Sequence, residues 1–555
     1  MEHPCTDAAC KGNGAAGPAN KETIRASLKT YLNAENLFFL SLIMITAGLA
    51  TSNILMSWGQ FGLAFAWLWQ RDYRRQWNRF ITQPQLVMHA GIFLLFVGGL
   101  IHTSDFGYGF HDLKIKLPLL LLPFLIGGFP FSDSRRATWI LHALLLTLLF
   151  CCATGVLIYL RILPWKADDV RKFSPFISSI RLSTLLVFGI FACGWLLFPS
   201  RREWRLLPRL FYAVSIVFFL GFIVLLKSLT GIIALLGAAW VLLLVWAFRK
   251  KKPFVRFSVT AAALLLPLFI FLYVRSQIRD FYRVEKVDFS ELQMSTPDGT
   301  YYKHDTTSWQ LENGHYVYLY IANWELKQEW NRRSAVDFDG FTTNGWPIRE
   351  TLIRFITSKG WKKNAGSVQK LTDDEIRAIE KGITNYRYMY PLRISSRIYQ
   401  VIWEYNEYIH TGDPNGKSLA TRLEFWKHGW SAVMRAPITG YGTGDTRKVL
   451  RDELQSASSK LDRAHWGNPH QQYLSVALAT GFAGLLIFLV LFIGPFAITP
   501  RLHVLQWVLL SISLIAMLDD DPLETQAGVT QLSLLFCLLF SVFPLNSTGR
   551  KKTNG

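Results

Sequence analysis

The sequence predicts a mainly α-helical, polytopic membrane protein. We expect about twelve transmembrane helices and one large external loop that contains helices and a small β-containing lobe. Of the 555 residues, 51% are hydrophobic and 14% are aromatic, which is more apolar than an ordinary soluble domain. The apolar residues also come in blocks of roughly 17–24, the length that crosses a bilayer core of about 30 Å.

The apolar blocks divide the chain into its predicted parts. They lie at 36–51, 53–70, 85–101, 117–131, 138–159, 179–198, 210–226, 231–248, 257–274, 474–498, 503–518 and 528–545. Pro118 and Pro123 interrupt the short fourth block, so we expect it to be kinked or partly re-entrant. The parts are a tail (1–35), nine spans (36–274), a long loop (275–473), three spans (474–545) and a second tail (546–555).

The positive charge of the chain is distributed as in a membrane protein. The net charge of +20 alone is compatible with nucleic-acid binding. However, basic residues gather in short loops that alternation places on one side, in RDYRRQWNR, SDSRR, SRREWR, FRKKK and GRKK. This positive-inside bias makes both tails cytoplasmic and the long loop external, and it argues against a nucleic-acid partner.

The long loop is too long to lack structure of its own. Asp298-Gly299 and Asn313-Gly314 are turn signals between aromatic and β-branched runs, so we expect hairpins in a lobe at about 284–383. Thr372 followed by Glu375 predicts the capped start of a helix. The remaining Arg/Gly-rich part, about 390–473, begins with a helix that Gly412 should end.

Arg422 begins a helical pattern near the end of this loop. Apolar and aromatic residues from Thr421 to Met434 recur close to helical spacing, as in a helix that could lie on a membrane surface. Periodicity alone favours a solvated or snorkelling arginine over a functional one.

A glycine-rich turn follows this helix. Gly440, Gly442 and Gly444 come after Pro437, and their first expected role is to let the backbone turn sharply. A pattern of this kind is weak evidence for phosphate binding. Asp445 could cap a short helix that begins at Thr446.

His470 is the best-placed histidine in the loop. Asn468 suits an N-cap and Pro469 suits the first helical position, which would put His470 in the first turn of the tenth span. The positive end of a helix favours neutral imidazole there, and a neutral histidine can accept a proton from a hydroxyl. An interfacial histidine that only hydrogen-bonds a neighbour is equally compatible, and His465 is a competitor.

Further ionisable groups lie at external membrane edges. Arg181 and Lys227 could converge with Arg422 on a pyrophosphate, although Lys227 could equally snorkel. The acidic loop DDDPLETQAG could bind a divalent ion or orient sugar hydroxyls, but we expect the three aspartates at 519–521 to form a solvated turn. Glu524 of the same loop is a candidate for orienting sugar hydroxyls.

Four motifs, taken in order, resemble the O-antigen ligase and polymerase family of bacterial membrane glycosyltransferases. They are SLTG at 228–231, RLEFW at 422–426, PITGYGTG at 437–444 and NPHQQYL at 468–474. The separation of Arg422 from His470 is also similar, and the arrangement of spans extends the resemblance to most of the chain.

The resemblance implies an enzyme of the bacterial inner membrane that works at the periplasmic face. It would move a glycan from undecaprenyl pyrophosphate to a hydroxyl of lipid A-core, with inversion, without a cofactor and without a metal. His470 would be the base and Arg422 would hold the pyrophosphate. The expected substrate-binding residues are Arg181, Lys227, Arg397, Gly440, Gly442, Tyr473 and Glu524.

Two positions depart from the family pattern. Leu229 stands where the family usually has an arginine, so Lys227 or Arg181 would have to supply that pyrophosphate contact. Gln471 replaces a common asparagine and keeps an amide. A polymerase and a ligase for protein acceptors remain alternatives. A transporter for the same lipid-linked glycan ranks below them, because the ionisable groups gather at the external edge and the two halves of the chain show no related repeat.

Overall fold

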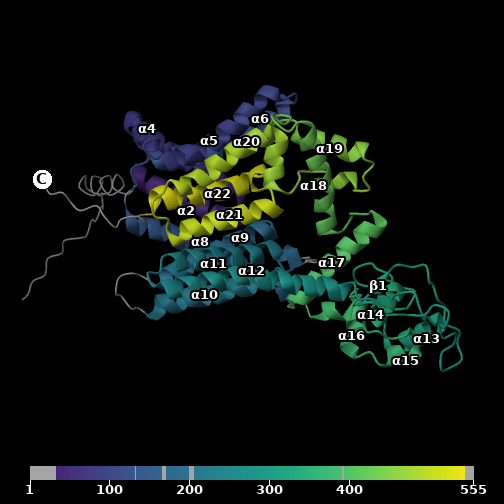
Figure 1. Cartoon of the computed structure of the whole chain (residues 1–555). Coiled ribbons are helices and arrows are strands. Elements are labelled where there is room, and N and C mark those ends of the chain that lie inside the picture. Colours follow the sequence, from purple (N-terminus) through teal and green to yellow (C-terminus); the bar gives the residue numbers. More distant parts are fainter. Residues whose placement is uncertain (1–32, 132, 166–169, 199–205, 391–392, 544–555) are drawn as a thin grey trace, which may run out of the picture.

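The computed structural model describes residues 33–131, 133–165, 170–198, 206–390 and 393–543. Helices dominate this part of the chain, with one two-stranded sheet. The tails predicted at 1–35 and 546–555 lie almost entirely outside the described residues. Figure 1 shows a bundle of apolar helices, with α17 to α19 and a separate lobe at one end and α4 (Tyr73–Ile81) at the other.

Among the described residues, eight helices are long and apolar enough to cross a membrane. They are α2 (Ala34–Thr51), α5 (Pro84–Gly98) with η1 (Gly99–His102), α8 (Ser134–Tyr159), α9 (Ser179–Leu197), α10 (Leu206–Leu225), α11 (Leu229–Phe248), α12 (Pro253–Phe281) and α20 (Gln472–Ala497). The mainly helical fold expected from the sequence is therefore confirmed, with several candidate membrane spans.

The other predicted blocks coincide with shorter apolar helices. These are α3 (Asn53–Trp69), α7 (Pro118–Gly128), α21 (Val504–Asp519) and α22 (Gln526–Cys537), which continues as η6 (Leu538–Val542). The 11 residues of α7 span about 17 Å, too little to cross a bilayer core. The number of about twelve spans and the side on which the loop lies remain predictions.

Aromatic side chains form much of the interior of the bundle. Phe38 of α2, Phe188 of α9 and Phe536 of α22 are almost fully buried in one cluster with side chains of α7 and α8. A second cluster joins α5 to α20 through Phe96 and Phe488. These contacts hold α20, α21 and α22 beside the first half of the chain, which brings the end of the sequence next to α9 and α11 (Figure 1).

The lobe has a hydrophobic core of its own. Trp330, Phe355 and Ile356 are buried between α13 (Asn323–Arg333), α14 (Ile348–Ser358), α15 (Ala365–Gln369) and α16 (Asp373–Glu380). The capping box at the start of α16, between Thr372 and Glu375, is confirmed.

The predicted β structure in the lobe is small. Strands β1 (Leu311–Glu312) and β2 (His315–Tyr316) pair antiparallel, with Leu311 opposite Tyr316. The Asn313-Gly314 turn joins them with φ of 51° and 86°, as expected for a two-residue hairpin turn. Most of the regular secondary structure in the lobe is helical, which the sequence interpretation understated.

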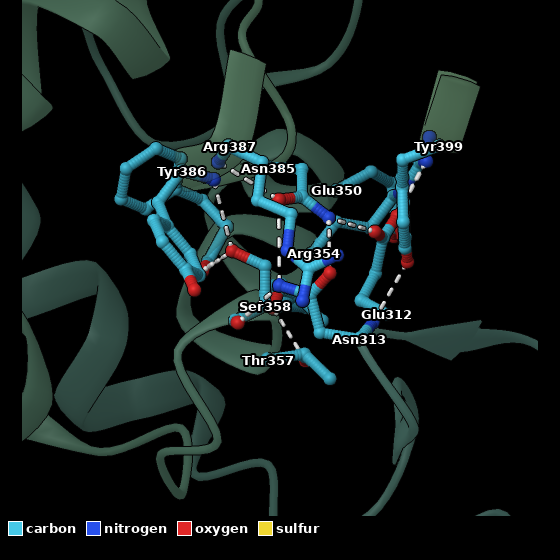
Figure 2. Close-up of polar contacts among 12 residues, drawn as sticks. Glu312, Asn313, Glu350, Arg354, Thr357, Ser358, Asn385, Tyr386, Arg387 and Tyr399 are labelled. Atoms are coloured by element: carbon cyan, nitrogen blue, oxygen red, sulfur yellow. Dashed lines mark hydrogen bonds and ion pairs between the residues drawn. The ribbon is translucent and has the colours of Figure 1, made fainter. Parts of the chain in front are cut away.

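A buried ion pair crosses the interior of the lobe (Figure 2). Arg354 of α14 donates from Nε (2.8 Å) and Nη2 (2.5 Å) to Oε1 of the fully buried Glu312. Asn385 donates from Nδ2 to the other Glu312 oxygen at 2.7 Å. Both carboxylate oxygens are therefore hydrogen-bonded, as burial of a charge requires.

The lobe is fixed to α17 (Ile394–Thr411) by neighbouring contacts. The Arg354 guanidinium lies 4.6 Å from the ring centroid of Trp403. The Asn313 backbone N–H donates to Tyr399 Oη at 2.8 Å (Figure 2). Gly412, with φ 65°, ends α17 as predicted. The lobe is thus joined to the helix that leads into the part of the loop that contains Arg422 and His470.

The amphipathic helix predicted around Arg422 is confirmed as α18 (Ser418–Arg435). Phe425 and Val433 are fully buried, in contacts with α19 (Thr446–Ser456) and α20. Trp430 and Met434 are more than half exposed. The orientation of α18 relative to a membrane surface remains a prediction.

Candidate active site

Arg422 is held by the loop between the last two apolar helices. Its Nη1 lies 2.6 Å from Oδ1 of Asp519, which is 97 residues away in the chain. Thr230 of the SLTG motif donates its hydroxyl to Oδ2 of the same carboxylate. Asp519 therefore brings two of the predicted motifs together.

The SLTG motif has a structural explanation at each of its polar and small positions. Ser228 is the N-cap of α11, and its Oγ accepts from the Gly231 backbone N–H at 3.1 Å. Ser183 of α9 hydrogen-bonds the Ser228 hydroxyl at 2.8 Å. A Cβ at position 231 would lie 2.6 Å from Ser183 Cβ, so glycine allows the close approach of α9 and α11. This packing points Thr230 toward Asp519.

The predicted position of His470 in the first helical turn is wrong. Helix α20 begins at Gln472, because Gln471 is the N-cap and accepts the Leu474 backbone N–H at 2.6 Å. Asn468 instead accepts a hydrogen bond from Arg447 Nε at 2.8 Å. His470 precedes the helix with φ 52°, in the left-handed region.

The ring of His470 lies between α18 and the acidic loop. The side chain is 46% exposed, its Nδ1 is 3.8 Å from Asp521 Oδ1, and its centroid is 5.8 Å from that of Phe425. Partial burial lowers its pKa from the ordinary value near 6.5, against the opposing effect of Asp520. Neutral imidazole is therefore the dominant form at neutral pH, with a ring available to accept a proton.

The aspartates do not form a solvated turn, and that prediction is wrong. Asp519 is paired with Arg422 and Thr230, while the side chain of Asp521 is only 7% exposed. Oδ2 of Asp521 has no hydrogen-bond partner among the described residues. Burial, Glu524 and Asp520 raise the pKa of Asp521 well above its ordinary value.

One group of side chains has the donor set of a metal site. Within the described ranges, one ligand atom each from His470, Asp520 and Asp521 lie within 4.8 Å of one another. Oxygen and imidazole donors of this kind suit several divalent ions. The sequence interpretation expects no metal here, so this convergence calls for a direct test.

A mainly apolar cavity opens beside this site, between α9, α21 and α22. Phe188, Ile512 and Leu535 contribute apolar walls, and Arg181 and Asp520 are among its polar lining residues. Since Asp520 also belongs to the group around His470, the cavity and the polar site are continuous. An apolar chain with a charged head would fit such a surface.

Residues 383–489 match the family model described as O-antigen ligase. This part of the chain is similar to the O-antigen ligase family. The match covers about a fifth of the chain and includes Arg422, the glycine-rich turn and His470. It supports a ligase- or polymerase-type function and, together with the apolar helices, a membrane protein in the context of lipid-linked glycans. No curated protein matches the chain.

The glycine-rich turn inside the matched segment packs against helices. Gly440 and Gly442 have φ of 66° and 95°, which confirms the sharp turn. A Cβ at Gly440 would lie 2.6 Å from the Gly481 backbone nitrogen, and one at Gly442 would lie 2.4 Å from Thr103 Oγ1. These glycines let the turn pack against α20 at Gly481, where the helix is kinked, and against Thr103, which follows η1. A substrate contact by either glycine stays a prediction.

The predicted cap at Asp445 is wrong. Helix α19 begins at Thr446 as expected, but the Asp445 side chain does not bond its first turn. The carboxylate instead accepts the Ser104 backbone N–H at 2.5 Å and the Ser104 hydroxyl at 2.6 Å. Tertiary contact with the turn between η1 and α6 (Phe106–Lys116) has replaced the local cap.

The basic residues of the family prediction occupy different surroundings. Arg181 is in the first turn of α9 and lines the cavity. Lys227, with φ 51°, lies in the turn between α10 and α11, directly before the Ser228 cap. Arg397 of α17 donates from Nη1 to Gln400 Oε1 at 2.7 Å. Of these three, Arg181 is the residue that lines the cavity beside the site.

Two further predicted substrate contacts are engaged in other bonds. Tyr473 donates its hydroxyl to the Leu514 carbonyl at 3.0 Å. Glu524 binds Lys116 Nζ at 3.0 Å and Gln472 Nε2 at 3.2 Å. These geometries describe structural roles, and contacts of Tyr473 or Glu524 with substrate stay predictions.

Sequence reasoning did not single out Thr230, Asp519, Asp521 or Lys116 as members of the site. Thr230 was inside a quoted motif, but nothing in the motif indicates its partner. Lys116 had an available signal, since a lysine next to an apolar block is costly to bury and is often functional or paired. Asp519 had no such signal, because its partner lies in a different helix.

Proposed function

We propose that this chain is an O-antigen-ligase-like glycosyltransferase of the bacterial inner membrane. It transfers a glycan from undecaprenyl pyrophosphate to a hydroxyl of lipid A-core at the periplasmic face. The observation that carries the proposal is the meeting of His470, Arg422 and Thr230 around the Asp519–Asp521 loop. His470 and Arg422 both lie in the segment that matches the family model.

His470 is the general base in this proposal. Its lowered pKa keeps the imidazole neutral, so a ring nitrogen can take the proton of the acceptor hydroxyl. Asp521 lies on the Nδ1 side at 3.8 Å, which leaves Nε2 as the nitrogen that faces the acceptor. The nearby carboxyl groups then favour the imidazolium that forms.

The transfer is a single displacement at the anomeric carbon. The acceptor oxygen forms a bond to that carbon while the bond from the carbon to the pyrophosphate oxygen breaks, and the electron pair leaves with the pyrophosphate. The products are the glycosylated acceptor, undecaprenyl pyrophosphate and protonated His470, which returns its proton to water. One displacement inverts the anomeric configuration.

Arg422 and Arg181 stabilise the leaving group. Arginine offers planar, bidentate donors that suit phosphate oxygens. Arg181 lines the apolar cavity, which accommodates the start of the polyprenyl chain, and Arg422 approaches from α18. Arg181 also supplies the basic group that is missing at Leu229. Asp519 holds Arg422 in the unliganded protein and is displaced or shared when the pyrophosphate binds.

Glycan transfer by the purified protein from a lipid-linked donor tests the proposal. Wild type should glycosylate lipid A-core with inversion, and His470→Ala should lower kcat by about 100- to 10,000-fold while the protein stays folded. Lipid-linked glycan and a hydroxyl-bearing protein are offered as competing acceptors. Extension of the lipid-linked glycan alone would assign a polymerase, and full activity in His470→Ala would remove the proposed base.

Chelation tests the alternative use of the carboxylate–histidine group. We expect EDTA to leave the transfer rate unchanged, because arginines offset the charge on the pyrophosphate. Two results together would show that His470, Asp520 and Asp521 hold an ion. EDTA would remove activity that Mg²⁺ or Mn²⁺ then restores, and Asp520→Asn would prevent this restoration.

A further inference from the structure

A buried lysine lies beneath the acidic loop. Lys116 is the last residue of α6 (Phe106–Lys116), and its side chain is 1% exposed. Its Nζ lies 2.6 Å from Asp112 Oδ1, 3.0 Å from Glu524 Oε2 and 4.7 Å from the centroid of Phe96. A buried ammonium requires such partners, since an unpaired one would be strongly destabilising.

Glu524 extends this cluster to the start of α20. Its second oxygen, Oε1, accepts from Gln472 Nε2 at 3.2 Å. Gln472 is fully buried, and its Oε1 accepts the Leu523 backbone N–H at 2.8 Å. The Gln472 backbone N–H also donates to the Asp520 carbonyl at 3.2 Å. Three bonds from one glutamine therefore hold residues 520–524.

The cluster joins the two halves of the proposed site. Gln472 follows His470 by two residues, while the loop that it holds carries Asp519, Asp520 and Asp521. We infer that Lys116 is a positioning residue that, through Glu524 and Gln472, fixes the acidic loop against the His470 segment. This inference rests on the proposed function and adds to it a residue from α6.

Lys116 acts at a distance in this arrangement. Within the described part of the chain, its recorded contacts are with Asp112, Glu524 and Phe96, and none is with His470 or Arg422. The groups that it orients indirectly are Asp519, which holds Arg422, and Asp521, which faces His470. A displacement of about 1 Å at such groups can lower a rate by roughly a hundredfold.

The experiment removes the charges without removing volume. In Asp112→Asn/Lys116→Met/Glu524→Gln, each side chain is replaced by a neutral one of similar size, so no buried charge is left unpaired. We expect kcat to fall at least tenfold while KM for the lipid-linked donor changes less than threefold, since the cavity and both arginines remain. Amide hydrogen exchange of residues 519–524 should become faster.

The lobe offers a matched control. Glu312→Gln/Arg354→Met neutralises another buried ion pair, and we expect it to leave kcat within twofold of wild type and exchange at 519–524 unchanged. A folded triple variant with wild-type kcat would overturn the positioning role. If the triple variant does not fold, Gln472→Leu cuts the same connection without altering charge, and it should give the same fall in kcat.

Failure of the proposed function is distinguishable from failure of this inference. Absence of transfer by wild type, or full transfer by His470→Ala, would contradict the proposed chemistry. The exchange measurement needs no activity. Unchanged exchange at 519–524 in both the triple variant and Gln472→Leu would overturn the positioning of the loop whatever reaction the protein performs.

Discussion

The lobe and the active-site edge each contain an arginine bound to a carboxylate, but the two pairs differ in what surrounds them. In the lobe, Glu312 is fully buried and both of its oxygens are hydrogen-bonded by Arg354 and Asn385 (Figure 2). At the edge, Asp519 is about a third exposed and binds Arg422 beside a half-exposed His470.

This difference separates a structural pair from one that is available for chemistry. Both oxygens of Glu312 accept hydrogen bonds within the protein, so a ligand would have to displace Arg354 or Asn385 to reach them. At the edge, Asp521 retains an unpartnered oxygen and the Arg422 guanidinium can exchange a carboxylate for a phosphate. The ion pair in the lobe is therefore structural, whereas the one at Asp519 can open to bind a ligand.

The largest expected difference between the regions is in the rate of transfer. Arg422→Met should lower kcat/KM about a hundredfold, because it removes donors from the leaving pyrophosphate. Arg354→Met, the same substitution in the lobe, should leave kcat of the folded protein within twofold. Transfer kinetics on both variants makes the comparison, and equal losses would show that the lobe takes part in catalysis.

The next difference is in folding stability. Here the substitution in the lobe, Arg354→Met, should have the larger effect, and Arg422→Met the smaller one. Arg354→Met leaves Glu312 buried with Asn385 as its remaining partner, and breaking such a pair costs about 3–5 kcal/mol. Faster hydrogen exchange in α14 measures this loss. Arg422→Met should change exchange in its own helix much less, since Asp519 can be solvated. Unchanged exchange in α14 would show that the lobe pair contributes little.

The smallest expected effect is a shift of the pH profile. His470 must be neutral to act as a base, so the rate should fall as pH falls through its pKa, which lies below 6.5. Asp520 raises the pKa of His470. Asp520→Asn should therefore move the acid limb of the kcat/KM profile to lower pH, whereas Glu312→Gln should not move it. A shift to higher pH would contradict the assignment of that limb to His470.

Local patterns predicted the parts of this fold whose cause is local. The apolar blocks correspond to helices because bilayer thickness determines their length. The Asn313-Gly314 hairpin, the Thr372 capping box and the Gly412 helix end each depend on a few neighbouring residues, and all are confirmed.

Contacts between distant residues were not predictable in this way. Asn468 and Asp445 have the chemistry of helix caps, but Arg447 and Ser104 bind their side chains instead. An acidic loop ordinarily indicates a solvated turn, and no local pattern shows that Arg422 and Lys116 meet it from 97 and 408 residues away. Family resemblance located His470 and Arg422, whereas the carboxylates that hold them required the structure.

The left-handed backbone of His470 bears on how this protein balances folding against activity. A side chain with a Cβ in that conformation is disfavoured by about 1–2 kcal/mol, and glycine is not. His470→Gly should consequently be inactive yet better folded than His470→Ala, which makes it the preferred variant for capturing the donor complex. A histidine thus stands where the backbone alone favours glycine, so folding stability is lowered at the residue that we propose as the base.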